Sequence, residues 1–208
     1  MKLTLTLSLC LLSGLSLSVA RAQVNADVSF GVGTTSVSSS GQSINTFGNG
    51  TLYNTPSMTG AFGKISGDLI LKRGFGIGAE YSFRFSQGPY AGLNYRPSFY
   101  DVNAVYSPVL HSKRIQPEFQ GGLGGMRLSY FQNVSACDSF AGCSSTNNFV
   151  ESSNHFQLHG LAAVRVYLTP KIFVRPEVDV HWVNNLFQFG SNFVPQYGVS
   201  LGYSFGRE

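Results

Sequence analysis

Apolar and polar residues alternate along most of this chain with a period of two. Successive side chains of a β-strand point to opposite faces of the sheet, so this alternation predicts strands with one apolar and one polar face. The most explicit run, residues 172–183, separates Val174, Val178, Val180 and Trp182 from Arg175, Glu177, Asp179 and His181. Eight such runs follow one another: residues 27–35, 58–71, 75–86, 98–107, 114–130, 155–168, 172–183 and a closing run that ends at Phe205.

The segments between these runs are alternately long and short. The long ones are mostly rich in Ser, Gly and Asn and span residues 36–57, 87–97, 131–154 and 184–192; the short ones span 72–74, 108–113 and 169–171. Long loops on one side and tight turns on the other are typical of outer-membrane β-barrels. Each run also has about the nine residues that a tilted strand needs to cross the hydrocarbon core. We therefore predict an all-β fold, an eight-stranded antiparallel up-and-down transmembrane β-barrel.

Two features refine this topology. Ten strands would require a hairpin within residues 36–57, whose composition shows no strand pattern, so we expect a loop there. Glycines 121, 122, 124 and 125 predict a bend or bulge in the fifth strand. Arg127 falls on the apolar face of the same run, which we expect only near the outer edge of the membrane.

The charged residues lie mainly on the polar faces. They are Lys64, Asp68, Glu80, Arg84, Asp101, Glu118, Arg165, Arg175, Glu177, Asp179 and His181. The apolar faces carry aromatic residues near the strand ends, as in the interfacial girdles of membrane barrels. An eight-stranded barrel is only just wide enough for its own side chains, so we expect these charges to pair and to plug the lumen. In a soluble lipocalin-type cup, the alternative, they would line a ligand cavity and leave the aromatic residues in water.

The N-terminus has the three parts of a secretory signal peptide. Lys2 precedes a Leu-, Ser- and Thr-rich apolar stretch, residues 3–19, and Ala20-Arg21-Ala22 matches a cleavage site. A transmembrane anchor, the alternative, needs roughly 20 apolar residues, and this stretch is shorter and interrupted by Ser. We expect a signal peptide at 1–22 and an outer-membrane barrel domain at 23–208.

Cleavage would leave Cys137 and Cys143 as the cysteines of the mature chain. In an exported protein this close pair predicts a disulfide, because neither a His nor a third Cys stands at metal-ligand spacing. The net charge of the chain is +4 and falls to +2 without Lys2 and Arg21, so no basic patch indicates nucleic-acid binding.

The closing run alternates outward apolar residues with Gly and Ser. Its apolar residues are Tyr197, Val199, Leu201, Tyr203 and Phe205. This strand resembles the closing strand of bacterial outer-membrane barrels, where it serves as an assembly signal, and the resemblance implies recognition by the barrel-assembly machinery. With the signal peptide, the eight runs, Gly-Ala-Glu-Tyr-Ser-Phe at 78–83 and Gly-Tyr-Ser-Phe at 202–205, the chain is similar to the small OmpA-type or Opa-like outer-membrane β-barrel domain family. The similarity implies a place in the bacterial outer membrane among its lipids.

Residue types that carry chemistry are present but do not predict an enzyme. His155 with Ser152, Ser153 and Glu151 has the types of a nucleophile, a base and an orienting acid, but they lie in or beside a loop. His159 and His181 face the predicted lumen, where membership of the ion network is the simpler interpretation than an acid–base or metal site. The glycines at 121–125 lack the Lys-Ser/Thr and the helix of a phosphate loop. We predict no catalytic, cofactor or metal site.

The expected function follows from the architecture. We expect a monomeric barrel with a structural or surface-interaction role, in which the extracellular loops hold any recognition site for an extracellular partner. The first alternative is a narrow channel for small solutes or ions through the charged lumen. The second is a lipid-modifying enzyme at the outer leaflet.

Overall fold

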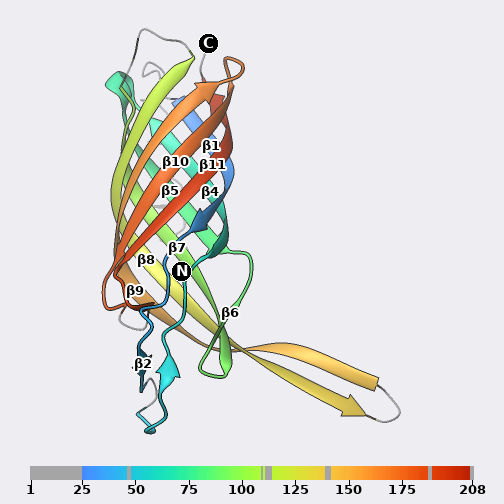
Figure 1. Cartoon of the computed structure of the whole chain (residues 1–208). Coiled ribbons are helices and arrows are strands. Elements are labelled where there is room, and N and C mark those ends of the chain that lie inside the picture. Colours follow the sequence, from blue (N-terminus) through green and yellow to red (C-terminus); the bar gives the residue numbers. More distant parts are fainter. Residues whose placement is uncertain are drawn as a thin grey trace, which may run out of the picture.

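The computed structural model describes residues 25–45, 48–108, 110, 114–138, 142–186 and 189–206. The expected signal peptide at 1–22 lies outside them. Within the described residues, eight strands form a closed antiparallel barrel (Figure 1). They are β1 (Asn25–Thr35), β4 (Gly60–Ile70), β5 (Phe75–Arg84), β7 (Leu93–Tyr106), β8 (Ile115–Asp138), β9 (Gly142–Tyr167), β10 (Ile172–Val183) and β11 (Phe193–Phe205). Each pairs with the next, and β11 returns to β1 with Ala26 opposite Phe205. The predicted fold class is confirmed.

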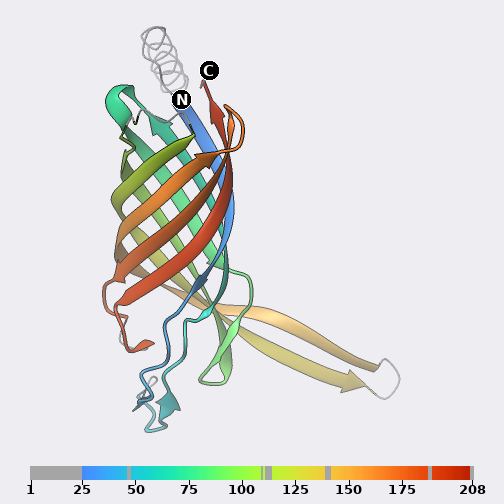
Figure 2. The same cartoon turned by 45° about the horizontal axis from the view of Figure 1, so that its top comes forward.

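The two ends of the barrel differ, as Figures 1 and 2 show. The turn end carries the 3-10 turn η1 (Lys72–Gly74), the connections 107–114 and 168–171, the start of β1 and the end of β11. The loop end carries the connections 36–59, 85–92 and 184–192 together with the extended ends of β8 and β9. No helix in the described part of the chain is long and apolar enough to cross a membrane.

Three segments expected to be loops contain strand. Residues 36–57 hold a small hairpin outside the barrel, in which β2 (Ser43–Ile44) pairs with β3 (Tyr53–Asn54). β6 (Gly88–Tyr90) folds back on the start of β7, which begins at Leu93. The largest difference is in residues 131–154, where the prediction of a loop is wrong: β8 and β9 continue, paired, far beyond the barrel. Both faces of this segment carry mainly polar residues, so it lacks the apolar alternation that reveals the barrel strands.

The glycine-rich part of β8 is regular, and the predicted bulge is not there. Residues 121–125 stay in register with both β7 and β9, and the register shift lies at Tyr130/Phe131. The glycines instead allow β7 and β8 to lie close together, because a Cβ at Gly122 or Gly124 would overlap backbone oxygen atoms of β7. Glycine in a strand often marks such a site.

The two faces of the barrel wall follow the predicted alternation. Outward side chains are apolar and exposed; Phe30, for example, is 64% exposed and Leu123 60%. Inward side chains are polar or charged over the middle of the lumen and buried. At the loop end the inward residues change to an apolar cluster. The lumen thus has a charged layer in its middle and an apolar layer at the loop end.

Candidate functional site

The middle of the lumen holds a lysine surrounded by three carboxylates. Lys64 of β4 places Nζ 3.1 Å from Glu80 Oε1 of β5, 3.2 Å from Glu177 Oε1 and 2.5 Å from Asp179 Oδ2, both on β10. All four side chains are almost fully buried. Opposite charges at these distances in a space without bulk water attract strongly, and each group would be costly to leave unpaired.

Two arginines form a second cluster nearer the turn end. Arg165 of β9 contacts Asp27 and Glu118 and lies 2.9 Å from Asp68. Arg175 of β10 lies 2.9 Å from Glu118 Oε1 and 3.4 Å from Asp68 Oδ2. Its Nε is 2.7 Å from Glu177 Oε2, which joins this cluster to that of Lys64. Both guanidinium groups are fully buried.

Uncharged donors complete the network. In the described part of the chain the buried charged groups comprise seven carboxylates and three strong bases, so hydroxyl and amide groups supply further contacts. Ser200 donates to Glu177 at 2.7 Å, Gln120 to Glu118 at 2.8 Å, and Asn103 to Asp101 at 2.6 Å. Such pairing is what permits buried charge.

Two histidines lie beside these carboxylates. The rings of His159 and His181 stack with centroids 4.8 Å apart and planes 19° apart, and Phe99 also stacks on His181, with centroids 4.4 Å apart. His159 Nδ1 is 3.2 Å from Asp101 and its Nε2 is 3.3 Å from Asp179. Asp101, His159 and His181 offer ligand atoms within 4.8 Å of one another, as do Glu80, His159 and Asp179. His159 hydrogen-bonds within this group, whereas neither ring nitrogen of His181 has a hydrogen-bond partner among the described residues.

The lumen differs from the sequence expectation at two residues. Arg84 was expected in the ion network but lies at the loop end, where its Nη1 donates to Tyr95 Oη at 3.1 Å; within the described residues no carboxylate pairs with it. Asp27 belongs to the network but was not among its expected members, whereas His159, interpreted from the sequence as a member, lies beside Asp101 and Asp179. The alternation of β1 was the available signal for Asp27, since it falls on the polar face.

An apolar cluster closes the lumen at the loop end, and the sequence reasoning did not foresee it. Its buried residues come from barrel strands and from loops: Val37, Met58, Phe62, Tyr90, Tyr95, Phe99, Met126, Leu128, Val183, Leu186, Phe189 and Val194. The rings of Tyr95 and Phe189 meet edge to face at 5.2 Å. We call this cluster the apolar plug. It separates the charged network from the loop-end solvent.

Beyond the barrel, β8 and β9 form a two-stranded extension (Figure 1). We call residues 131–138 and 142–149 the β8–β9 ribbon. The predicted disulfide joins Cys137 to Cys143, which face each other across its tip. β7 pairs with β8 only as far as Phe131, and β10 pairs with β9 only from Gln157. The outer edges of the ribbon therefore carry no neighbouring strand of the barrel.

Ser153 and His155 of β9 do meet, because residues two apart in a strand share a face. Ser153 Oγ lies 3.2 Å from His155 Nε2. Within the described residues no carboxylate contacts the other ring nitrogen, so the orienting acid of a nucleophile–base–acid arrangement is missing.

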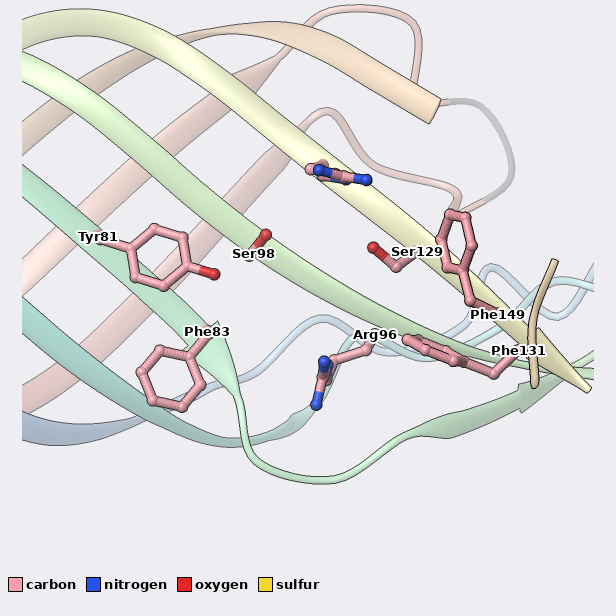
Figure 3. A pocket seen from close by; sticks show the side chains of 8 residues that line it. Tyr81, Phe83, Arg96, Ser98, Ser129, Phe131 and Phe149 are labelled. Atoms are coloured by element: carbon pink, nitrogen blue, oxygen red, sulfur yellow. The ribbon is translucent and has the colours of Figure 1, made fainter. Parts of the chain in front are cut away.

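A groove lies on the outer wall at the loop end, where β5, β7, β8 and β9 meet (Figure 3). Its volume is about 590 Å³, and it is lined by Tyr81, Phe83, Arg96, Ser98, Arg127, Ser129, Phe131 and Phe149. The rings of Tyr81 and Phe83 lie on one side and those of Phe131 and Phe149 on the other. Arg127 is exposed on the outer wall, as its place on the apolar face indicated.

Solved structures share this architecture. The outer membrane protein OprG of Pseudomonas aeruginosa is 13% identical, with 87% of this chain and 95% of that chain covered and a TM-score of 0.55. Neisserial surface protein A is 15% identical, with 88% and 97% covered and a TM-score of 0.52. The chain has the fold of the small outer-membrane β-barrels. The resemblance expected from the sequence is thereby confirmed.

A third barrel is the attachment invasion locus protein Ail of Yersinia pestis, solved in complex with the heparin analogue sucrose octasulfate. It is 13% identical, with 88% and 99% covered and a TM-score of 0.50. No protein-family model and no curated protein matches the sequence. These similarities establish the fold alone, and the closing strand Tyr197, Val199, Leu201, Tyr203 and Phe205 retains its predicted role as a hypothesis.

Proposed function

We propose that this protein is an integral protein of the bacterial outer membrane with a closed lumen, and that its β8–β9 ribbon binds an extracellular partner. The observation that carries the proposal is the ribbon, which continues β8 and β9 beyond the barrel with its edges unpaired. Unpaired strand edges are templates for pairing with another chain. Val134 of the ribbon is 46% exposed and offers an apolar contact to such a partner.

The chemistry of the ribbon favours a polypeptide partner. Residues 131–150 contain neither Lys nor Arg. The ribbon therefore has no cationic side chain that would pair with the sulfate groups of a ligand such as sucrose octasulfate. Its free main-chain donors and acceptors suit an extended segment that adds as a further strand. The disulfide between Cys137 and Cys143 holds the two strands together at the tip.

The layers of the lumen support a closed barrel over a channel. An ion would have to pass the apolar plug and then displace the paired groups around Lys64 and Arg175, which are buried. Each step lacks the hydrated path that conduction needs. We also propose that the protein is not an enzyme, because within the described residues no carboxylate accompanies the Ser153–His155 contact as an orienting acid.

Two experiments test the proposal. The mature chain, refolded and checked by heat-modifiable electrophoretic mobility, should insert into a planar bilayer without steady conductance; a stable conductance would show that the lumen is a path. A photo-crosslinking residue at Val134 should capture a polypeptide on intact cells, and an excess of the disulfide-closed peptide 131–150 should abolish the crosslink. The same residue at Lys171, exposed at the turn end, is the matched control. A crosslink that survives the peptide would exclude the ribbon as the binding element.

A further inference from the structure

Two arginines lie next to each other on the outer wall of the barrel. Arg96 of β7 pairs with Ser129 of β8, and Ser98 pairs with Arg127. Arg96 and Arg127 are thus diagonal neighbours on one face of an antiparallel pair, a relationship that places Cα atoms about 7–8 Å apart. Both are exposed, and both line the groove of Figure 3.

Among the residues that the structure describes, no acidic side chain contacts this pair. Among the described residues every Asp or Glu in an ion pair lies in the lumen, and none contacts Arg96 or Arg127. Glu151 pairs with Tyr130, so it points to the other face of the wall from Arg127 and Ser129. Arg96 instead lies over the ring of Phe131 at 5.4 Å, an arrangement that leaves its N–H edge available. Two like charges so placed repel each other and favour a bound anion.

The strand pattern gives the depth of this pair in a membrane. On β7 the outward apolar residues run from Tyr106 to Tyr100, and Ser98 and Arg96 follow. About 9–11 residues of a tilted strand cross the hydrocarbon core, so a core that begins at Tyr106 ends near Ser98 and Arg96. On β8 the same count from Ile115 ends near Gly125, just before Arg127. Both arginines therefore fall at the headgroup level of the leaflet at the loop end.

We propose that this groove binds a phosphate group of the glycolipid that forms the outer leaflet of the outer membrane. Arginine pairs with phosphate through two parallel N–H···O bonds, and two arginines on adjacent strands can hold one phosphate between them. The hydroxyl groups of Ser98 and Ser129 line the same groove and supply further donors. The aromatic rings on both sides contact the lipid at the interface, where such rings are favourable. The proposal rests on the membrane placement proposed above.

The test uses the full mature chain in phosphatidylcholine nanodiscs, with lipid A as the probe and dephosphorylated lipid A as the comparison. Native mass spectrometry measures the bound lipid. The variant Arg96→Gln/Arg127→Gln should bind lipid A at least about tenfold more weakly than the wild type, because hydrogen bonds to a charged group are lost. The variant Arg73→Gln/Lys171→Gln removes the same charge from exposed positions at the turn end and should bind as the wild type does. If the Gln variant fails to fold, Arg96→Lys/Arg127→Lys keeps the charge without the bidentate geometry and should show a smaller loss.

The outcomes separate the two proposals. Failure of the wild type to insert into bilayers contradicts the membrane placement itself. An inserted wild type that binds lipid A and its dephosphorylated form equally, or that binds lipid A no more tightly than the folded Gln or Lys variants, overturns the groove proposal alone. Displacement of lipid A by millimolar inorganic phosphate would show that the groove binds free phosphate, and would overturn the proposal that its ligand is a lipid.

Discussion

Lys64 reaches across the lumen to Asp179, with 2.5 Å between Nζ and Oδ2, although 115 residues separate them along the chain. Lys64 belongs to β4 and Asp179 to β10, and β1 and β11 lie between these strands in the barrel wall. The contact therefore ties two strands that do not pair with each other. Main-chain pairing closes the wall, and cross-lumen ion pairs of this kind fill the space inside it.

Replacement of Lys64 by Met should destabilise the folded barrel strongly. Glu80, Glu177 and Asp179 would lose the cation that they share, and removing one partner of a buried ion pair costs about 3–5 kcal/mol. Urea unfolding in lipid vesicles, followed by tryptophan fluorescence and by heat-modifiable mobility, measures the change in unfolding free energy.

Two further variants sharpen this test. Lys171→Met removes an exposed lysine at the turn end and should change stability by no more than about 0.5 kcal/mol. Lys64→Met/Asp179→Asn removes one of the unpaired carboxylates and should recover part of the loss. A loss of less than about 1 kcal/mol for Lys64→Met would mean that water or protons already neutralise the cluster.

Gly121 and Gly124, three residues apart in β8, should respond oppositely to alanine. A Cβ at Gly124 would overlap backbone atoms of Tyr100 and Asp101, whereas one at Gly121 has open space around it. Gly124→Ala should destabilise the barrel by about 1–3 kcal/mol, the usual effect of overpacking. Gly121→Ala should be neutral or stabilising by up to about 1 kcal/mol, because it restricts the unfolded chain. Equal effects of the two substitutions in the same unfolding assay would show that β7 and β8 can separate freely.

The barrel itself could be predicted from the sequence because each strand has one outward side that is apolar. An apolar outer wall places an apolar residue at every second position, and this produces the alternation seen in residues 172–183. The inward side could be predicted only as polar. Which acid pairs with which base depends on the relative shift of the strands around the barrel, and alternation within a strand contains no information on that shift. Hence Arg84 was assigned to the network, although it lies with Tyr95.

The ribbon and the apolar plug were missed for related reasons. In water both faces of a strand can be polar, so residues 131–149 carry no periodic signal although they pair regularly. The plug combines inward residues of the strands, such as Phe99, with loop residues such as Met58 and Phe189. These residues meet only when the barrel closes, and no local pattern reveals that. Phe99 and Met126 even interrupt the polar face on which they lie.

Removal of the disulfide should affect the ribbon and leave the barrel intact. Cys137 and Cys143 face each other at the tip, far from the lumen contacts that hold the barrel. An isolated two-stranded hairpin is marginally stable in water, so Cys137→Ser/Cys143→Ser should let the ribbon open more often. Hydrogen exchange of the amides in residues 132–148 should become at least about tenfold faster, while the urea midpoint of the barrel stays unchanged. Reduction of the wild type should reproduce the effect; unchanged exchange in both would mean that the strands hold themselves together.

The closing strand offers a test of its predicted role in assembly. Phe205 points outward, is 51% exposed, pairs its backbone with Ala26 and packs its ring edge to face against Tyr203 at 4.8 Å. Phe193 begins the same strand, is 58% exposed, and serves as a matched control at the loop end. Because both rings lie on the outer surface, alanine at either position should leave refolding of the purified chain into vesicles nearly unchanged. If the C-terminal residues are read during assembly, Phe205→Ala alone should reduce the amount of heat-modifiable protein in the outer membrane and increase the periplasmic fraction. Equal losses for both variants in cells would place the effect in the barrel wall and contradict a signal at the end of the chain.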